Sequence, residues 1–315
     1  MLSLGLEFST AEFNSALRRH APSGVVDFAL NATPGFVAGL LLGLSVPMAM
    51  VLAGVTWVSS SGMVSRTIVD LGRVSFRETP AVLSVLVLED IAMAAYLPLV
   101  GVVVAGTSIL TGVRAVGLAI AAVASVLVLS RFASPALDRF LTHDSSEQVL
   151  LRVLGLTIVV AGLAEHIGIS AAVGAFLVGL TIGGQTADAA RSLLEPLRDL
   201  FAAAFFLYFG YVTDPREIGP VLPVALALAA VTALTKMGTG WYAARRDGVG
   251  SRGRWRAGTA LIARGEFSVV IAGLAVAAGQ TQVGALATAY VLTLAVGGPI
   301  LTRFAGQRRD AQPRP

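Results

Sequence analysis

Long apolar stretches constrain the fold of this chain more than any other feature of its sequence. A helix needs about 20 predominantly apolar residues to cross the hydrocarbon core of a bilayer. With that window the sequence predicts ten membrane-spanning helices, over residues 22–44, 46–66, 80–104, 112–131, 149–166, 169–184, 196–213, 217–243, 256–278 and 281–303. Only 13% of the residues are charged and 55% are hydrophobic, which excludes an ordinary soluble domain. The expected fold class is an all-α polytopic membrane protein.

The distribution of basic residues predicts the orientation of these helices. Counted on alternate sides of the spans, 19 of the 23 Lys and Arg residues fall on the side of the N-terminus, and only Arg114 and Arg216 fall on the other. Because cytoplasmic loops carry an excess of positive charge, both ends of the chain are expected in the cytoplasm, with the helices in the plasma membrane. The net charge of +4 is then explained by contact with the lipid bilayer, without nucleic acid as a partner.

The two remaining basic residues, Lys236 and Arg264, lie inside predicted spans. A cation in the hydrocarbon costs at least about 2.5–3.5 kcal/mol, so such a residue normally faces protein or a water-filled cavity. Two adjacent acids, Glu89 and Asp90, also interrupt an apolar run. At a helical rise of about 1.5 Å per residue, Asp90, Lys236 and Arg264 all lie about 12–15 Å from the cytoplasmic ends of their spans. This common depth predicts a single buried polar site.

Two spans contain residues that favour opening of a transmembrane helix, because serine hydrogen-bonds to nearby backbone and glycine relaxes the backbone. These residues are Ser59, Ser60, Ser61 and Gly62 in the second span and Arg264, Gly265 and Glu266 in the ninth. Interrupted helices at corresponding places in two halves of a chain indicate a secondary transporter built from inverted repeats. Tight packing of small residues is the alternative for the serine-rich stretch, and a structural role is the alternative for Arg264 and Glu266.

Five stretches, taken in order, resemble the monovalent cation:proton antiporter-2 family, which includes Kef-type potassium-efflux systems and bacterial sodium/proton exchangers. They are LSLGLEFS, SSSGMVSRTI, VLEDIA, AAVGAFLVGLTIGG followed by EPLRDLFAAAFFLYFGYV, and ALIARGEFSVVIAGLA. The resemblance covers nearly the whole chain. It implies a cation/proton antiporter fold with two discontinuous crossing helices, a homodimer, and no cofactor or bound metal other than the transported cation.

The resemblance also implies roles for individual residues. Asp90 would alternately bind a proton and a monovalent cation, Na⁺ or K⁺, and Lys236 would be the charge partner of the acidic site. Glu89 is a departure, since relatives commonly have Gln, Asn or Asp there. We expect Lys236 to pair with the acidic site when no cation is bound; exchange is electrogenic if Lys236 then releases its proton, and electroneutral if it keeps it. Asp27 and Asn31 lie four residues apart on the first span and so share a face; a polar contact between helices is favoured for them, and lining of the cavity is the alternative.

The resemblance further predicts how the chain is divided. Its parts are a tail of an upstream helix and loop over 1–21, the two halves of a core bundle over 22–104 and 217–303, scaffold and dimer-side helices over 105–213 with an interfacial helix over 132–148, and a basic cytoplasmic tail over 304–315. Relatives have more spans than this chain supplies, so upstream spans are expected to be missing.

Three classes of function remain open. Secondary antiport is favoured, and it requires no catalytic residue. An intramembrane enzyme would need a second acid to pair with Asp90, for which Glu266 is the only candidate. The third class is a non-transporting truncated fragment or an assembly partner of an antiporter. The absence of cysteine excludes a thiolate metal site, and the three histidines show no ligand spacing.

Overall fold

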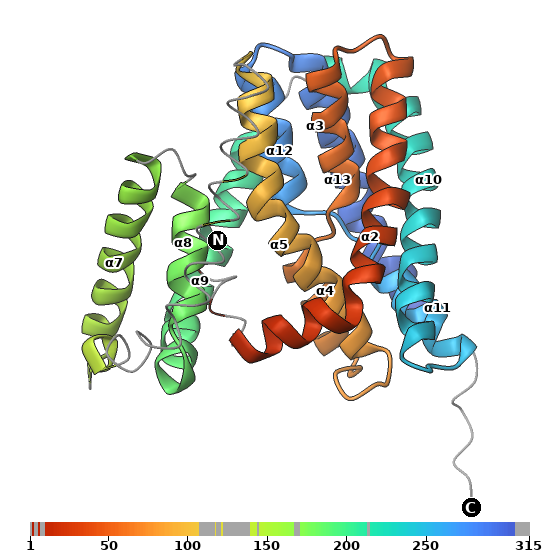
Figure 1. The fold of residues 1–315 in the computed structure, drawn as a ribbon. Helices are drawn as coiled ribbons and strands as arrows, with labels where there is room; N and C mark the ends of the chain where they lie inside the picture. Colours follow the sequence, from red (N-terminus) through yellow and green to blue (C-terminus); the bar gives the residue numbers. More distant parts are fainter. Residues whose placement is uncertain are drawn as a thin grey trace, which may run out of the picture. The chain divides into compact units, whose positions relative to one another are not determined.

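The computed structural model of the chain describes residues 10–106, 139–143, 145–166, 171–212 and 215–305, together with residues 2, 6, 117 and 121. Every regular element within these ranges is an α-helix (Figure 1), as the sequence predicts. The helices are α2 (Thr10–Leu41), α3 (Val46–Trp57), α4 (Ser61–Asp70), α5 (Thr79–Val104), α7 (Ser146–His166), α8 (Ala171–Thr181), α9 (Gly184–Val212), α10 (Pro215–Arg246), α11 (Ser251–Ala260), α12 (Glu266–Ala277) and α13 (Thr281–Phe304).

The chain divides into two compact units. Unit 1 comprises Met1–Leu17 and Asp90–Phe205, and unit 2 comprises Arg18–Glu89 and Phe206–Pro315. The boundaries fall inside α2, α5 and α9, so each of these helices contributes to both units. Unit 2 therefore contains α3, α4 and α10 to α13 entire, including both places where an apolar span is interrupted.

Close backbone contacts hold the helices of unit 2 together. α10 packs against α11 and α13, and α12 packs against α3 and α13 (Figure 1). A Cβ atom at Gly35 on α2 would lie 2.3 Å from the Leu52 carbonyl oxygen on α3, and one at Gly240 on α10 would lie 2.6 Å from the Ala257 carbonyl oxygen on α11. Glycine at these two positions is what lets the helix backbones touch, a common device in membrane helix packing.

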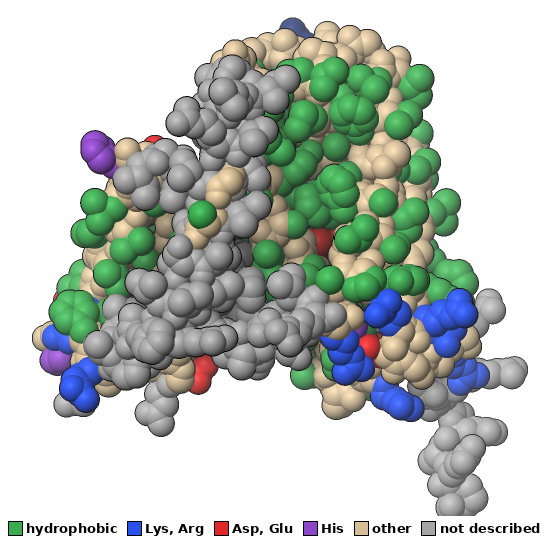
Figure 2. Space-filling view, viewed as in Figure 1, with side chains coloured by type: hydrophobic (Ala, Val, Ile, Leu, Met, Phe, Trp, Pro, Cys, Tyr) green, Lys and Arg blue, Asp and Glu red, His purple; other side chains and the backbone are tan. Residues whose placement is uncertain are grey.

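The surface of unit 2 has the character of a membrane-spanning bundle. In Figure 2 most of the Lys and Arg side chains on the visible face of this unit gather at its lower end, around α11, below a surface largely covered by hydrophobic side chains. Large apolar side chains point outward along its helices, and Leu41 is 83% exposed and Leu234 68%. Lipid is a suitable environment for such side chains, because their exposure to water would be unfavourable.

Unit 1 has its own apolar core, formed with α7, α8 and α9. The buried side chains of this core are Leu6, Leu141, Val149, Val153, Val178, Ile182, Ala187, Ala190 and Leu194. α7 and α8 pack closely, since a Cβ atom at Gly174 would lie 2.9 Å from the Ala164 Cβ atom. Unit 1 can therefore be described as a packed body in its own right.

Within the described residues, six helical segments are long and apolar enough to cross a membrane: Arg19–Leu41, Val46–Asp70 (α3 and α4 together), Thr79–Val104, Ser146–His166, Ile218–Arg246 and Thr281–Phe304. They overlap six of the ten predicted spans. Predicted span 112–131, apart from residues 117 and 121, lies outside the described residues, as do residues 132–138 and 144 of the predicted interfacial helix 132–148. Among the other residues of that prediction, 139–141 are helical, 142, 143 and 145 are not, and 146–148 belong to α7. Of the other three, 169–184 contains the short helix α8, 196–213 falls in α9, and 256–278 is divided into α11 and α12.

Candidate functional site

The chain leaves the helical conformation at two places in unit 2, and the two places are hydrogen-bonded to each other. α3 ends at Trp57 and α4 begins at Ser61, with Val58 and Ser60 in extended conformation. α11 ends at Ala260 and α12 begins at Glu266. Ser60 donates its backbone N–H to the Ala263 carbonyl at 2.9 Å, and Ser59 Oγ donates to the Leu261 carbonyl at 2.9 Å. The two interrupted helices therefore cross at their breaks.

Within the predicted breaks, the residues divide between linker and helix. Ser59, Ser60, Arg264 and Gly265 lie in the linkers, whereas Ser61, Gly62 and Glu266 already belong to the helices that follow. Ser60 caps the start of α4 by accepting from the Met63 N–H at 3.3 Å. A Cβ atom at Gly265 would lie 2.4 Å from Ser60 Oγ, so the crossing needs a residue without a side chain there.

Arg264 is fully buried and supplies positive charge where two half-helices end. Its guanidinium donates to the carbonyls of Thr56 (2.9 Å), Leu261 (3.1 Å) and Ile262 (3.2 Å), and to the Tyr290 hydroxyl (3.1 Å). Thr56 lies in the last turn of α3 and Leu261 caps α11, where carbonyl groups lack helical partners. A cation is favourable at these negative helix ends.

Glu266 has the complementary position. It lies in the first turn of α12, and its Oε2 accepts from Ser60 Oγ, at the N-cap of α4, at 2.9 Å. A carboxylate beside two helix N-termini is favourable for the same electrostatic reason. Arg264 and Glu266 thus balance the four half-helix ends that the crossing creates.

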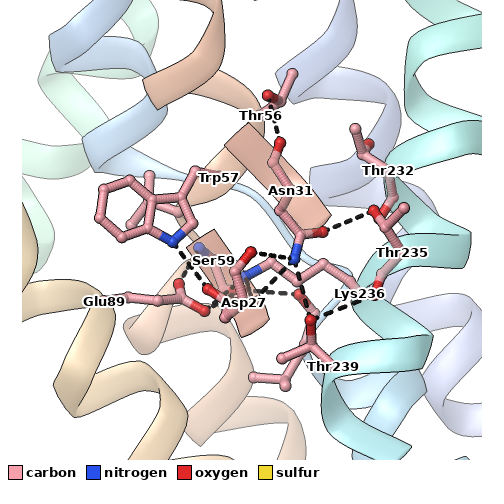
Figure 3. Close-up of polar contacts among 12 residues, drawn as sticks. Asp27, Asn31, Thr56, Trp57, Ser59, Glu89, Thr232, Thr235, Lys236 and Thr239 are labelled. Carbon is pink, nitrogen blue, oxygen red and sulfur yellow. Dashed lines mark hydrogen bonds and ion pairs between the residues drawn. The ribbon is translucent and has the colours of Figure 1, made fainter. Parts of the chain in front are cut away.

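Lys236 lies between two carboxylates in the interior of unit 2 (Figure 3). Its Nζ is 2.6 Å from Asp27 Oδ1 on α2 and 2.6 Å from Glu89 Oε1 on α5. The Lys236 and Asp27 side chains are completely buried and that of Glu89 is 2% exposed. A buried ion pair is weak evidence for stability, since desolvation offsets the attraction, but separating one member from the others is strongly unfavourable. The three side chains therefore behave as one charged cluster, which we call the Lys236 triad.

Hydrogen-bond donors surround the Asp27 carboxylate. Besides Lys236, Asn31 Nδ2 donates to Oδ1 at 2.9 Å and Trp57 Nε1 donates to Oδ2 at 2.9 Å. Glu89 is held at the first break, where Oε2 accepts from the Ser59 backbone N–H and Oε1 lies 3.2 Å from Ser59 Oγ. The triad thus connects α2, α5 and α10 to the linker between α3 and α4.

Hydroxyl groups extend this polar cluster along α10 toward α13 (Figure 3). Thr235 Oγ1 donates to Asn31 Oδ1 at 2.7 Å, and Asn31 Nδ2 lies 3.1 Å from Thr239 Oγ1. Thr232 Oγ1 lies 2.8 Å from the Tyr290 hydroxyl, which also contacts Arg264. Carboxylate, hydroxyl and carbonyl oxygens are therefore concentrated in one buried region, and hard monovalent cations prefer such oxygen ligands.

Asp90 follows Glu89 directly on α5 and is 2% exposed. Consecutive helical residues point about 100° apart, so the two carboxylates face different directions from the same turn. The boundary between the two units runs between them. Among the described residues there is no group of three His, Cys, Asp or Glu side chains placed to hold a metal ion.

Three side chains of this site, those of Asp27, Asn31 and Trp57, are not singled out as site residues by the sequence. The spacing of Asp27 and Asn31 favours a contact between helices over a place in the cavity lining. In the structure both belong to the polar cluster around Lys236, and the apolar span on α2 begins at Arg19, eight residues before Asp27. Trp57 carries no charge to single it out. The signal in the sequence that points to Asp27 is an acidic side chain within an otherwise apolar span.

The sequence of this chain is similar to those of known cation/proton antiporters. The family profile described as sodium/hydrogen exchanger, transmembrane, matches residues 1–306. The chain is 32% identical over 304 residues to the K(+)/H(+) antiporter subunit KhtU of Bacillus subtilis, covering 95% of this chain and 75% of that protein. It is 28% identical over 309 residues to the ammonium/H(+) antiporter subunit AmhT of Alkalihalophilus pseudofirmus, covering 96% and 77%.

A solved structure has the same fold. The sodium proton antiporter MjNhaP1 of Methanocaldococcus jannaschii matches with a TM-score of 0.71 at 14% identity, over 97% of this chain and 81% of that chain. The fold is therefore that of a cation/proton antiporter, and its apolar helices make the protein a multi-pass membrane protein. By its sequence, this chain belongs to the transmembrane sodium/hydrogen exchanger family.

Proposed function

We propose that this protein is a secondary active antiporter that exchanges a monovalent cation, Na⁺ or K⁺, for protons by alternating access at a buried carboxylate. Asp90 is the carboxylate that holds either the proton or the cation. Glu89 precedes it on α5, and Lys236 is the charge partner of this acidic pair, in contact with Glu89. The setting is the plasma membrane, with both chain ends in the cytoplasm and two copies of the chain forming a homodimer.

The observation that carries this proposal is the position of the Lys236–Glu89 ion pair at the crossing of two interrupted helices. Lys236 Nζ is 2.6 Å from Glu89 Oε1, and Glu89 also accepts from the backbone N–H of Ser59 in the first break. Intramembrane charges that face a protein interior commonly mark ion pathways. Discontinuous helices provide the irregular backbone at which transporters bind ions.

The names of the relatives support the class of cargo. KhtU is named for K⁺/H⁺ exchange, AmhT for ammonium/H⁺ exchange and MjNhaP1 for sodium and proton exchange. All three cargoes are monovalent cations. A proton and a cation that compete for one carboxylate are never bound together, and this mutual exclusion is the simplest way to couple the two fluxes.

Unit 2 supplies the moving part of the proposed mechanism. It contains both interrupted helices and the whole Lys236 triad, so it can carry the triad as one body, and Asp90 follows Glu89 directly at the boundary of this unit. Movement of this bundle relative to the scaffold helices exposes the site to one side of the membrane and then to the other.

The experiment that tests the function is cation-driven proton flux in proteoliposomes, with Na⁺, K⁺ and Li⁺ in parallel. The wild type is expected to move protons against at least one of these cations, and Asp90→Asn is expected to move none. Glu165→Gln, which removes an exposed carboxylate on α7, is the matched control and should retain the flux. Equal flux from wild type and Asp90→Asn would overturn the assignment of Asp90.

A further inference from the structure

We propose that Asp27 is a positioning residue of the exchange site: a fixed carboxylate that holds Lys236 in its charged form throughout the transport cycle. Lys236 then never gives up its proton, the exchanged proton is carried by the acidic pair on α5 alone, and the exchange of one cation for one proton moves no net charge. This inference rests on the antiport function proposed above. It adds the proton stoichiometry and a residue that the sequence pattern assigned to helix packing.

The hydrogen bonds of Asp27 suit an ionised carboxylate and not a carboxylic acid. Its two oxygens receive three donors: the ammonium of Lys236 at 2.6 Å, the side-chain amide of Asn31 at 2.9 Å and the indole N–H of Trp57 at 2.9 Å. The indole is a donor only, and the ammonium has no acceptor. The orientation of Asn31 is fixed as well, because its Nδ2 also donates to the Asp27 backbone carbonyl at 2.8 Å. All three of these contacts are donors, so none of them can accept a proton from a neutral Asp27.

The surroundings of Glu89 suit both its ionised and its protonated form. Ser59 Oγ is 2.9 Å from the Leu261 carbonyl and 3.2 Å from Glu89 Oε1. A hydroxyl group has one proton to donate, and the shorter contact is to the carbonyl. The oxygen of Ser59 can then accept a proton donated by a neutral Glu89, or a water or cation can take the place of that contact. Of the two carboxylates that contact Lys236, Glu89 can therefore be ionised or neutral, whereas Asp27 stays ionised.

The difference between Asp27 and Glu89 determines whether Lys236 keeps a counter-charge during transport. With only Glu89 beside it, the Lys236 ammonium would lose its counter-charge whenever Glu89 became neutral or turned to a cation, and a buried, unpaired ammonium tends to release its proton. Asp27 Oδ1 is as close to Nζ as Glu89 Oε1 is, so one full negative charge remains against the ammonium at every stage. The positive charge of Lys236 therefore stays in the site.

The other charged groups of unit 2 near the triad have their own partners. Arg264, in the linker between α11 and α12, donates to carbonyls and to Tyr290 of α13, and Glu266 of α12 accepts from Ser60. α5 also carries Asp90, which follows Glu89 directly and is the first residue of the α5 part of unit 1. Within α2, Arg19 and His20 lie close to Asp247, the residue directly after α10. Among the described residues of unit 2, Asp27 and Glu89 are thus the carboxylates in direct contact with Lys236.

The test compares charge movement with proton movement in proteoliposomes. On a solid-supported membrane, a jump in cation concentration is applied to wild type and to Asp27→Asn while a pH-sensitive dye reports proton flux. The wild type is expected to move protons without net current. Asp27→Asn is expected to generate current with each turnover, because Lys236 now releases its proton as a second exchanged proton. A net current from the wild type, or proton flux without current in Asp27→Asn, would overturn the proposal.

A binding measurement keeps the inference testable if Asp27→Asn does not turn over. Calorimetry of Na⁺ or K⁺ binding to the detergent-solubilised protein, in buffers with different ionisation enthalpies, counts the protons released per cation bound. We expect about one proton for the wild type and about two for Asp27→Asn. Release of two protons by the wild type contradicts the proposal even if the variant fails to fold.

Asn31→Ala is the matched control. It removes a hydrogen bond to Asp27 but leaves the Asp27 charge in place, so its current per proton is expected to stay at the wild-type value whatever its rate. If Asn31→Ala generates the same current as Asp27→Asn, the effect comes from loosening the network and the proposal fails. Absence of any cation-driven flux in the wild type, by contrast, counts against the antiport function itself.

Discussion

The backbone N–H of Ser60 donates to the carbonyl of Ala263 at 2.9 Å, which joins the break between α3 and α4 to the break between α11 and α12. These residues are about 200 positions apart in the sequence, so the bond fixes a long-range crossing and not a local turn. The serines and glycines of the two breaks leave backbone groups without helical partners. Some of these backbone groups are paired because each linker supplies hydrogen-bond partners to the other.

Substitution of Gly265 should loosen this crossing. In Gly265→Ala the added Cβ atom would lie 2.4 Å from Ser60 Oγ, so the linkers must move apart. We expect the free energy of unfolding to fall by about 1–3 kcal/mol, as in other overpacked sites, and a lower Tm in detergent measures the loss. Gly273→Ala on α12, where an added Cβ meets no atom within 4 Å, is the control and should not lower the Tm.

Removal of Arg264 should be more damaging than removal of one of its partners. In Arg264→Gln, the carbonyls of Thr56, Leu261 and Ile262 lose their buried cationic donor. A buried acceptor left without a partner costs about 1–3 kcal/mol. Tyr290→Phe removes the hydroxyl that contacts Arg264 and Thr232 but leaves those carbonyl contacts intact, and it should cost only about 1 kcal/mol. Thermal unfolding of the two variants side by side checks the order, and an equal loss would show that the carbonyl contacts contribute little.

The charged and interrupted parts of the fold could be predicted from the sequence because charge and helix-breaking residues are rare in an apolar span. Lys236 could be paired in advance with the acidic stretch by depth alone, and the structure brings it to Glu89. The second partner, Asp27, lies eight residues into the apolar span that begins at Arg19, but the spacing of Asp27 and Asn31 alone does not tell a contact between helices from a place beside the lysine. Which helices touch each other depends on packing between distant segments, as at Gly35 and Leu52, and no local pattern records it.

Loss of the Lys236 charge should destabilise unit 2 more than loss of the entire triad. Lys236→Met leaves two buried carboxylates within reach of each other, without the ammonium that lay 2.6 Å from each. Breaking a buried ion pair in this way costs about 3–5 kcal/mol, whereas replacing all the charges by neutral groups of similar size can be almost neutral. The triple variant Asp27→Asn, Glu89→Gln, Lys236→Met should therefore unfold at a higher temperature than Lys236→Met alone. The opposite order would mean that the carboxylates find other partners when the lysine is absent.

Asp27 and Glu89 should be interdependent in stability, since each can hold Lys236 when the other is neutral. Glu89→Gln keeps an oxygen that accepts from the Ser59 N–H, and Lys236 remains paired with Asp27. In Asp27→Asn, Lys236 remains paired with Glu89. Each single change is expected to cost about 1–2 kcal/mol, but the double change strands the ammonium and should exceed the sum of the two by at least about 1 kcal/mol. A double-mutant cycle from thermal unfolding in detergent measures this coupling, with Glu165→Gln combined with Glu89→Gln as an additive control from a different unit. Additivity of Asp27→Asn and Glu89→Gln would mean that Lys236 does not depend on either carboxylate for its charge, and it would remove the physical basis for sharing one ammonium between two acids.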